Sequence, residues 1–462
     1  MPEPADAAPR SAPPSDPPPA SPARHDPYGP WRNPDFRLYA VSWFLIVFAK
    51  HVETVTVQLY VYGETGDPLA LGWIGLAQAL PVMALSIAGG QLADRFDRRR
   101  VMSLMYAVSS LVAVGLWMSA REGSVALIYM LLAVDASTQA LGGPSRAAIL
   151  PQIVGPARLS TAITWSSSIF QIATMTGPAA GGMILGWVSL GIFDDLGGPS
   201  GSKYNTSLAF LVVIFSRMAA ATFVALVRTR RTAGAPDAVS WQSLVAGIRF
   251  VWRTKAILAT ITLDMFAVLF GGFTYLLPIY AEDILGVGAS GLGFLRSAEA
   301  VGAVTMAMVL AHLPPMKRSG RTLLWAVAGF GAATIAFALS RSYALSLVLI
   351  FVIGALDNIS VVIRHTLVQL LTPDAMRGRV SAVNTVFIVA SNDIGGLESG
   401  VTAKLFGPVA SVVIGGVGAI GVVIAAALKW PELRRLGALS DVRPPIEDRV
   451  LEETEAEQAA RG

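Results

Sequence analysis

Residues 89–101 read Gly-Gly-Gln-Leu-Ala-Asp-Arg-Phe-Asp-Arg-Arg-Arg-Val, a short charged segment between two long apolar stretches. Six of its side chains carry a charge: Asp94, Arg95, Asp97, Arg98, Arg99 and Arg100. Charges this dense cannot lie in hydrocarbon, so the flanking stretches must leave a bilayer here and be joined by a tight loop. The excess of arginine places that loop in the cytoplasm. The segment therefore predicts two consecutive membrane helices.

The composition extends this prediction to the whole chain. Of 462 residues, 53% are hydrophobic and only 14% charged, and the mean hydropathy is +0.57. A soluble domain carries about a quarter charged residues. We therefore expect an all-α membrane protein with about a dozen spans, because one span takes roughly 20 residues. The net charge of +4 is small and lies in loops, so we expect no nucleic-acid partner.

Several other classes of site are excluded or unsupported. The chain has no cysteine, so it forms no disulfide or thiolate metal site. It has no phosphate-binding loop ending in Gly-Lys-Ser/Thr, so we expect no ATP hydrolysis. The four histidines lack metal-ligand spacing. We expect no cofactor, no metal and no enzymatic activity.

Apolar stretches predict twelve spans in two six-helix halves. They lie near residues 37–61, 70–92, 100–119, 124–146, 160–188, 206–227, 256–280, 290–312, 321–340, 343–369, 381–404 and 408–429. With this topology, 28 of the 35 Lys and Arg residues fall in the tails and in the loops that follow even-numbered spans. That bias predicts that both termini are cytoplasmic.

The domain organisation follows from these spans. We expect a disordered, proline-rich cytoplasmic tail at 1–35, an N-terminal half at 36–228, a connector at 229–255, a C-terminal half at 256–430 and a cytoplasmic tail at 431–462. In the connector, apolar residues recur at helical spacing opposite polar ones, which predicts an amphipathic helix at the inner surface. The apolar set is Leu244, Val245, Ile248, Val251 and Trp252.

A weak self-similarity relates the two halves. At an offset of 218, Arg146, Gly177 and Gly182 match Arg364, Gly395 and Gly400. At an offset of 221, Leu71, Gly72, Ala77 and Ala79 match Leu292, Gly293, Ala298 and Ala300. Gly and Ala are common here, so chance accounts for some identities. Two parallel repeats nevertheless suit a carrier that exposes one site alternately to each side of the membrane.

Four segments carry a family resemblance. Gly90-x-Leu92-Ala93-Asp94-Arg95, with Arg98 and Arg99, resembles the signature between the second and third helices of the major facilitator superfamily. Residues 143–151, 247–250 and 373–382 resemble its enterobactin-exporter-like branch, which includes transmembrane secretion effectors and macrolide efflux proteins. Asp97 stands where the superfamily usually has glycine, as is common in that branch. The resemblance implies a transporter of the inner membrane whose spans one, four, seven and ten line a central cavity.

Two motifs bear on conformational change. Asp94 can pair with Arg95, Arg98 or Arg99 in one arrangement of the halves and release them in another, so we predict a latch and expect Asp94→Asn to impair transport without reducing expression. These charges can also act only in topology. Arg146 and Arg364, near the cytoplasmic ends of their spans, are predicted to anchor a gate. Gly177, Pro178, Gly181 and Gly182 resemble the exporter-type helix motif, with Ala173 in place of its first glycine, and favour a close, kinked contact between halves.

Charged residues within spans are the candidate site, because burying a charge in a bilayer is costly. The proton-coupling and cavity candidates are Glu53, Asp135, Asp264, Asp357, Arg296 and Glu299. A buried carboxyl group without a fixed cation can exchange protons near neutral pH. Alternatively, Lys50 with Glu53 and Arg296 with Glu299 simply neutralise each other on one helix face. Asp135 and Asp264 have no such neighbour, so their partners must come from another helix or from substrate.

The sequence thus predicts proton-driven export of a hydrophobic or amphipathic small molecule, a siderophore or a drug. Aromatic residues along the cavity helices suit such a cargo: Trp43, Tyr60, Phe170, Phe266, Phe270, Tyr275 and Phe387. The expected partners are the substrate, protons and the lipid bilayer, with the monomer as the working unit. The alternatives are a proton-coupled importer of a metabolite and a membrane scaffold or sensor that does not transport.

Overall fold

The computed structural model describes residues 26–189, 205–229, 241–314, 316–373 and 376–438, and within these ranges it contains helices and no strand. The N-terminal half comprises α1 (Pro34–Thr65), α2 (Pro68–Arg95), α3 (Arg98–Glu122), α4 (Val125–Val154), α5 (Pro156–Ser189) and α6 (Ser207–Leu226). A short helix, α7 (Trp241–Arg253), connects it to the C-terminal half. The all-α fold is as predicted.

The C-terminal half begins with an irregular leg. It consists of α8 (Lys255–Phe270), the 3-10 turn η3 (Gly272–Leu276), α9 (Leu277–Ile279) and the π-helical η4 (Tyr280–Ile284). The remaining helices are α10 (Gly288–His312), α11 (Ser319–Leu339), α12 (Tyr343–Leu371), α13 (Arg377–Phe406), α14 (Pro408–Lys429) and the short α15 (Pro431–Arg435). Ten helical legs are long and apolar enough to cross a membrane. Since α5 and α13 are not among the ten, twelve spans stay a prediction.

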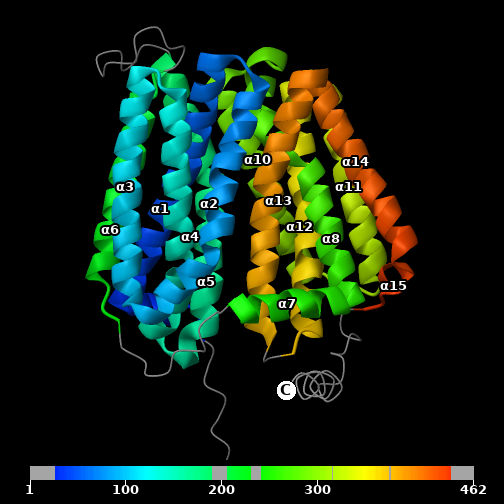
Figure 1. Ribbon diagram of the computed structural model, residues 1–462, viewed down its shortest axis with the longest axis horizontal. Helices are drawn as coiled ribbons and strands as arrows, with labels where there is room; N and C mark the ends of the chain where they lie inside the picture. The colour runs from blue at the N-terminus through cyan, green and yellow to red at the C-terminus, as the bar shows by residue number, and fades with distance from the viewer. Residues whose placement is uncertain (1–25, 190–204, 230–240, 315, 374–375, 439–462) are drawn as a thin grey trace, which may run out of the picture.

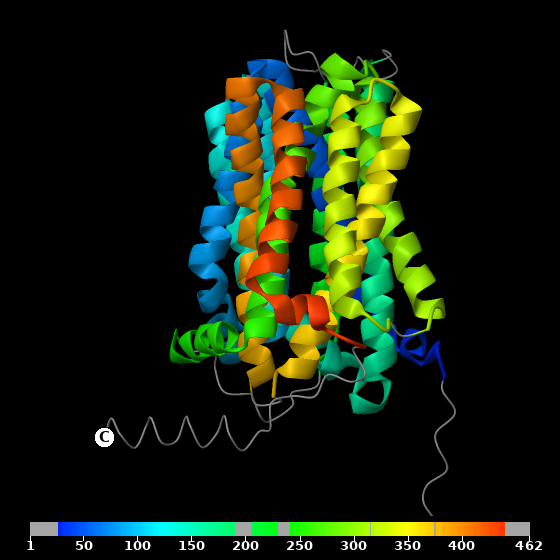
Figure 2. The same cartoon turned by 90° about the vertical axis from the view of Figure 1, so that its right-hand side faces the viewer.

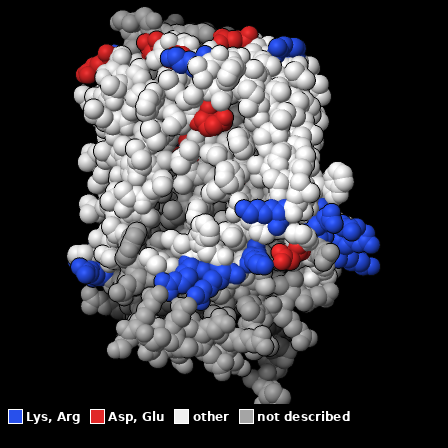
Figure 3. Space-filling view, turned by 45° about the vertical axis from the view of Figure 1, so that its right-hand side comes forward, with Lys and Arg blue, Asp and Glu red and all other residues white. Residues whose placement is uncertain are grey.

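The helix α7 lies across one end of the bundle (Figures 1 and 2). We call this end, where α1 begins and α14 ends, the α7 face, and the other end the opposite face. On the side of the molecule drawn in Figure 3, Lys and Arg gather toward the α7 face and acidic residues toward the opposite face. The helix α7 covers the whole expected apolar pattern, and its place at the inner surface of a membrane stays a prediction.

The disordered tail expected at residues 1–35 extends too far toward the first span. Residues Gly29–Arg32 form the 3-10 helix η1. Trp31 lies edge-on against Trp165, with ring centroids 5.3 Å apart, and also against Phe36. The Trp165 Nε1 donates to the Pro27 carbonyl oxygen at 2.8 Å. These aromatic contacts fix the segment before α1, whereas residues 1–25 lie outside the described part.

Four glycines of the internal repeat lie where the two halves touch. Gly182 of α5 lies against Gly293 of α10, and a Cβ added to it would lie 2.7 Å from the Gly293 Cα. Gly400 of α13 lies against Gly72 of α2, with the corresponding distance 3.0 Å. Gly182 and Gly400 are related by the offset of 218, and Gly72 and Gly293 by that of 221. The two seams are therefore repeat-related, and a side chain at any of these positions would push the halves apart.

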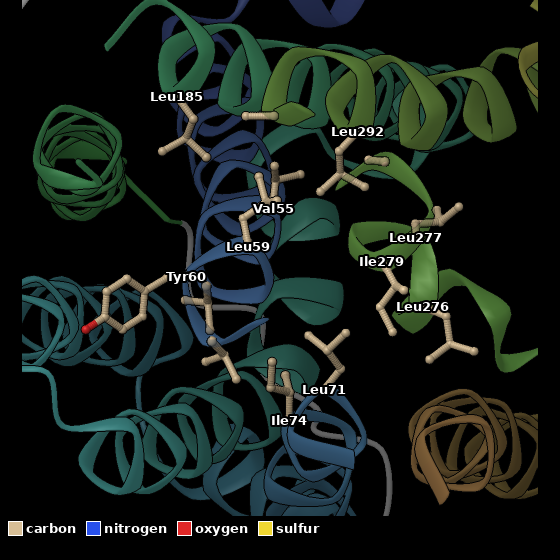
Figure 4. Packing of buried hydrophobic residues seen from close by; sticks show 14 of the residues in the cluster. Val55, Leu59, Tyr60, Leu71, Ile74, Leu185, Leu276, Leu277, Ile279 and Leu292 are labelled. Atoms are coloured by element: carbon tan, nitrogen blue, oxygen red, sulfur yellow. The ribbon is translucent and has the colours of Figure 1, made fainter. Parts of the chain in front are cut away.

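Both seams lie toward the opposite face, and the apolar packing agrees. One cluster of buried residues there joins the two halves (Figure 4); it includes Val55, Leu59, Leu71, Ile74 and Leu185 from the N-terminal half, with Leu276, Leu277, Ile279 and Leu292 from the C-terminal half. Toward the α7 face there are two separate clusters. One, around Phe36 and Ile149, belongs to the N-terminal half, and the other, around Ile257 and Leu367, to the C-terminal half and α7. The halves are thus sealed at the opposite face.

Candidate functional site

A cavity of about 230 Å³ opens in the N-terminal half, on the α7 side of this seal. Five helices supply its walls, and its lining combines aromatic, polar and basic side chains: Trp43, Lys50 and His51 from α1, Tyr106 and Ser109 from α3, Thr138, Gln139 and Arg146 from α4, Phe170 from α5 and Arg217 from α6. None of the lining residues is acidic. The predicted cavity aromatics Trp43 and Phe170 are in this wall.

At the inner end of the cavity lies a buried cluster of four charges. The Arg217 guanidinium reaches both acids: its Nη2 lies 2.9 Å from the Glu53 Oε2 and its Nη1 lies 3.0 Å from the Asp135 Oδ1. The Lys50 Nζ lies 3.4 Å from Glu53 and 3.2 Å from Asp135. Both acids and Arg217 are fully buried, while the Lys50 side chain is 23% exposed toward the cavity. Two acids face two cations, so the cluster is electrically balanced.

Neutral side chains complete the cluster. The Ser109 hydroxyl donates to the Asp135 Oδ1 at 2.6 Å, and the Gln139 amide donates to the Oδ2 at 2.9 Å. Lys50 also donates to the Gln78 Oε1 at 3.0 Å. These bonds satisfy part of the hydrogen-bonding capacity of the cluster, while the buried Arg217 Nε has no hydrogen-bond partner among the described residues. The partner required for Asp135 therefore comes from other helices, α1, α3 and α6.

One arginine in the cavity wall stays outside this balance. The Arg146 guanidinium stacks on the Trp43 ring, 4.0 Å from its centroid. Trp43 in turn lies nearly parallel to Phe170, with centroids 6.0 Å apart and planes at 18°, and its Nε1 donates to the Ser166 carbonyl at 3.2 Å. Within the described residues, Arg146 has neither a carboxylate partner nor a hydrogen bond. Its predicted role as a gate anchor stays a prediction.

The C-terminal half arranges its charges differently. Asp264 of α8 forms an ion pair with Arg364 of α12, and both side chains are buried. Glu299 and Asp357 are close enough to interact electrostatically, yet within the described residues neither has a cation at ion-pair distance. Asp357 lines a small cavity together with Asp264. The partner predicted for Asp264 is thus another helix, and two acids stay without a fixed cation.

The predicted Arg296–Glu299 neutralisation is replaced by a contact between the halves. Arg296 donates to the Gln58 side chain of α1 and to the Thr274 carbonyl oxygen, the latter at 2.8 Å. Nearby, the Tyr62 hydroxyl donates to Asp283. These polar contacts lie between the balanced cluster and the opposite face. They add to the seal formed by the glycine seams.

At the surface of the opposite face an ion pair joins the two halves. The Lys404 Nζ at the end of α13 lies 2.6 Å from the Asp67 Oδ2, and Asp67 also caps α2 by accepting from the Leu69 amide. The Lys404 hydrogen bond and, more weakly, the Leu69 amide hold the pKa of Asp67 below its ordinary value. Both side chains are partly exposed, so solvent and salt weaken the pair.

The charged loop at 89–101 is held within the N-terminal half. Asp97 is the N-cap of α3, where its carboxylate accepts from the Arg99 and Arg100 amides at 2.9 and 3.2 Å. Arg98 donates to the Ala148 carbonyl oxygen at 3.0 Å, and Arg99 donates to that of Val227 at 3.1 Å. Val227 is the C-cap residue of α6, where carbonyls lack helical partners, whereas Ala148 lies inside α4, six residues before its end.

The latch itself stays a prediction. Gly90 and Arg95 lie in the last two turns of α2, as expected for a loop signature. The Asp94 side chain lies outside the described part of the chain. What the structure adds is a reason for the acid at position 97, because an Asp caps a helix N-terminus and a glycine would leave its amides without that acceptor.

The exporter-type motif contacts two neighbours. Gly177 lies against His51 of α1, where an added Cβ would lie 2.6 Å from the His51 Cβ, and Gly181 lies 3.2 Å, measured the same way, from the Val52 Cα. Gly182 faces the other half, and the Pro178 carbonyl oxygen lies 2.5 Å from a Cβ added at Gly293 of α10. Pro178 lies inside α5, which continues past it to Ser189. The close contact between halves is therefore made by the backbone of Pro178 and Gly182.

Sequence reasoning did not include Arg217 and Lys50 in the site. Arg217 lies between helices α1, α4 and α6, with Glu53 and Asp135 as its acidic partners. The available signal was the balance of charges between spans. One arginine lies on the sixth span and acids lie on the first and fourth, and buried charges of opposite sign are stable when they pair. The stacking of Arg146 on Trp43 had no sequence signal, because the residues are a hundred positions apart.

Comparison with known proteins gives a consistent result. The family model of the Major Facilitator Superfamily matches residues 38–396. The enterobactin exporter EntS of Escherichia coli O1:K1 is 26% identical over 414 residues, covering 87% of this chain and 93% of that protein. Among solved structures, an inward-facing, occupied bacterial homolog of the human lysosomal transporter Spinster aligns with a TM-score of 0.69 at 16% identity, covering 89% and 99% of the two chains. A D-xylose–proton symporter aligns with a TM-score of 0.63 at 15% identity, covering 86% and 96%.

Proposed function

Since this chain belongs to the Major Facilitator Superfamily, we propose that it exports an amphipathic small molecule of the siderophore or drug type, driven by protons. It is an integral membrane protein and a transporter, not an enzyme. The observation that carries the cargo class is the similarity to enterobactin exporters over 93% of their length. The mixed aromatic and polar lining of the cavity suits such a cargo.

The position of the cavity indicates the side of the membrane to which this arrangement is open. The halves are sealed at the opposite face and the cavity lies toward the α7 face. The positive-inside rule makes the α7 face cytoplasmic, because most Lys and Arg residues lie in segments expected there. In this arrangement the protein is inward-facing. An exporter loads its cargo from the cytoplasm in this state and an importer releases its cargo there, so the proposed direction rests on the similarity to enterobactin exporters.

For coupling, the two halves offer different acids. Glu53 and Asp135 are each paired with two cations, so a proton would have to displace an existing ion pair. Glu299 and Asp357 face each other's charge, with Arg296 acting on Glu299 at longer range and Asp264 already paired with Arg364. Among the predicted coupling residues we therefore favour Glu299 and Asp357 as the proton carriers, because no fixed cation has to be released.

The test is transport into inside-out vesicles with an acidic interior. Enterobactin serves as the siderophore probe and a macrolide as the drug probe, each with and without the pH gradient. Gradient-dependent accumulation of either probe, abolished by a protonophore, supports export. Gradient-driven loss of preloaded probe from the interior would show import, and a wild-type protein that moves neither probe in either direction would contradict the proposal.

A further inference from the structure

The repeat-related arginines Arg146 and Arg364 have different partners. Arg364 pairs with Asp264, whereas Arg146 stacks on Trp43. Asp264 lies 221 residues after Trp43, which is the offset that relates α2 to α10. The N-terminal half therefore has an aromatic ring where the C-terminal half has the acid for its arginine.

As a result, the cavity carries one positive charge, that of Arg146, which no acid among the described residues neutralises. The other two cations in its wall, Lys50 and Arg217, are balanced by Glu53 and Asp135. His51 also lines the cavity and can only add positive charge. Since no acid is in the lining, an anion entering this cavity contacts the cations of its wall and not the acids that balance two of them.

The geometry of Arg146 leaves it ready to bind an anion. The Arg146 Cζ lies over the Trp43 ring, and among the described residues the guanidinium N–H groups have no hydrogen-bond partner. A carboxylate or a similar planar anion accepts two of these N–H groups at once. The Trp43 and Phe170 rings beside the guanidinium provide an apolar, stacking surface for the group that bears the anion.

We propose that this cavity recognises a cargo through an anionic group attached to an aromatic ring, with the anion on Arg146 and the ring against Trp43 and Phe170. The inference rests on the proposed transport function, whose cargo class it narrows. A volume of about 230 Å³ is at the small end of ligand pockets, so the cavity holds such an aromatic acid moiety rather than the whole of a large cargo.

The experiment measures calorimetric binding to the purified full-length protein with three probes that share one ring system. These are 1-naphthoate, the neutral 1-naphthamide and the cationic 1-naphthylmethylammonium. We expect the anion to bind at least about tenfold more tightly than the amide, as a charge-assisted hydrogen-bonded pair provides, and the cation not to bind. Arg146→Gln abolishes the difference between anion and amide, and Arg146→Lys retains part of it.

The chain offers a matched control. Arg121 also stacks on a tryptophan, Trp117, at 5.4 Å, but neither residue lines the cavity. Arg121→Gln should keep the preference for the anion. Trp43→Leu should weaken naphthoate and naphthamide alike, because it removes stacking and not charge. Equal binding of anion and amide to the wild type, or a preference that survives Arg146→Gln, would overturn the inference.

Two further outcomes separate this inference from the proposed function. If the wild-type protein accumulates enterobactin in the inside-out vesicles but binds naphthoate and naphthamide equally, only the inference about the anion site is contradicted. A wild-type protein that prefers naphthoate but moves no cargo contradicts the transport proposal and leaves the binding site in place. If Arg146→Gln fails to give a monodisperse protein, Arg146→Lys and Trp43→Leu decide the question on folded material.

Discussion

The two halves share one architecture and differ in charge. Their glycine seams are repeat-related, but at the repeat-related polar positions the N-terminal half has Trp43, Gln78 and Gln139 where the C-terminal half has Asp264, Glu299 and Asp357, at offsets of 221, 221 and 218. The N-terminal half therefore has an excess positive charge at its cavity, and the C-terminal half has acids without a fixed cation. We infer a division of work in which one half binds cargo and the other carries protons.

The largest effect on stability is expected in the balanced charge cluster of the N-terminal half. Arg217→Gln leaves Glu53 and Asp135 buried with only Lys50, and breaking a buried ion pair costs about 3–5 kcal/mol. Arg364→Gln breaks one ion pair, with Asp264, whereas Arg217→Gln breaks two, so the loss is smaller for Arg364→Gln. Thermal unfolding in detergent should show a clearly lower Tm for Arg217→Gln.

A second variant checks that charge balance is the cause. Arg217→Gln combined with Asp135→Asn leaves one acid facing one cation, so we expect it to recover much of the stability. Equal Tm values for Arg217→Gln and Arg364→Gln would show that the two halves hold their charges at the same energetic cost. The proposed contrast between them would then fail.

The next prediction concerns the proton carriers. Glu299→Gln combined with Asp357→Asn gives the C-terminal half amides at these positions, as the N-terminal half has. This double variant should abolish gradient-driven accumulation, because no group is left to take up the proton. Exchange of labelled for unlabelled cargo without a gradient should continue, since the cavity is unchanged. Both activities are measured in the same inside-out vesicles.

The matched controls are Asp135→Asn and Asp264→Asn, the acids that the sequence favoured for coupling. If either of these uncouples transport while the double variant remains coupled, protons are carried by the paired acids. The assignment of protons to Glu299 and Asp357 would then be wrong. The fold and the cargo site would not be affected by that result.

A third prediction concerns a variant in which the N-terminal half receives an acid at the position that corresponds to Asp264. Trp43→Asp places a carboxylate where Asp264 stands in the repeat, so it should pair with Arg146 and occupy the anion site. We expect naphthoate affinity to fall by about tenfold, equivalent to about 1.4 kcal/mol, by calorimetry. Trp43→Phe, which keeps a ring and adds no charge, serves as the control and should retain most of the affinity.

The fold was largely readable from the sequence, because it depends on local patterns. The last predicted span, 408–429, coincides with α14, since Gly407 has a φ of +88° and Pro408 begins the helix. The amphipathic α7 followed equally from its spacing. Hydrophobic runs and helix caps act within a few residues, so a single sequence contains them in full.

The candidate site was readable only in part, because its contacts are long-range. The sequence showed that Asp135 and Asp264 needed partners from elsewhere, but not that these are Arg217 and Arg364 on the sixth and tenth spans. The repeat offset of 221 relates Trp43 to Asp264. The sequence did not show that both residues contact the repeat-related arginines, Arg146 and Arg364.

The smallest expected effect is at the ion pair that joins the halves at the opposite face. Asp67→Asn removes the charge that Lys404 pairs with, and an exposed pair contributes at most about 1 kcal/mol. The sealed arrangement should therefore lose no more than about fivefold in population. Because the chain has no cysteine, spin labels can be attached at Glu122→Cys and Arg341→Cys, exposed on the two halves, and the distance between them measured.

The pH dependence of this seal has a defined sign. The pKa of Asp67 is lowered by Lys404, so the pair's contribution is fully present above the ordinary aspartate pKa of about 3.9 and is lost as the pH falls through the lowered pKa. Between pH 5 and pH 8 this pair should therefore leave the wild-type distance distribution unchanged, and about 1 M salt should reduce the difference between wild type and Asp67→Asn. A large Asp67→Asn effect that resists salt would mean that this surface pair, rather than the glycine seams, holds the halves together.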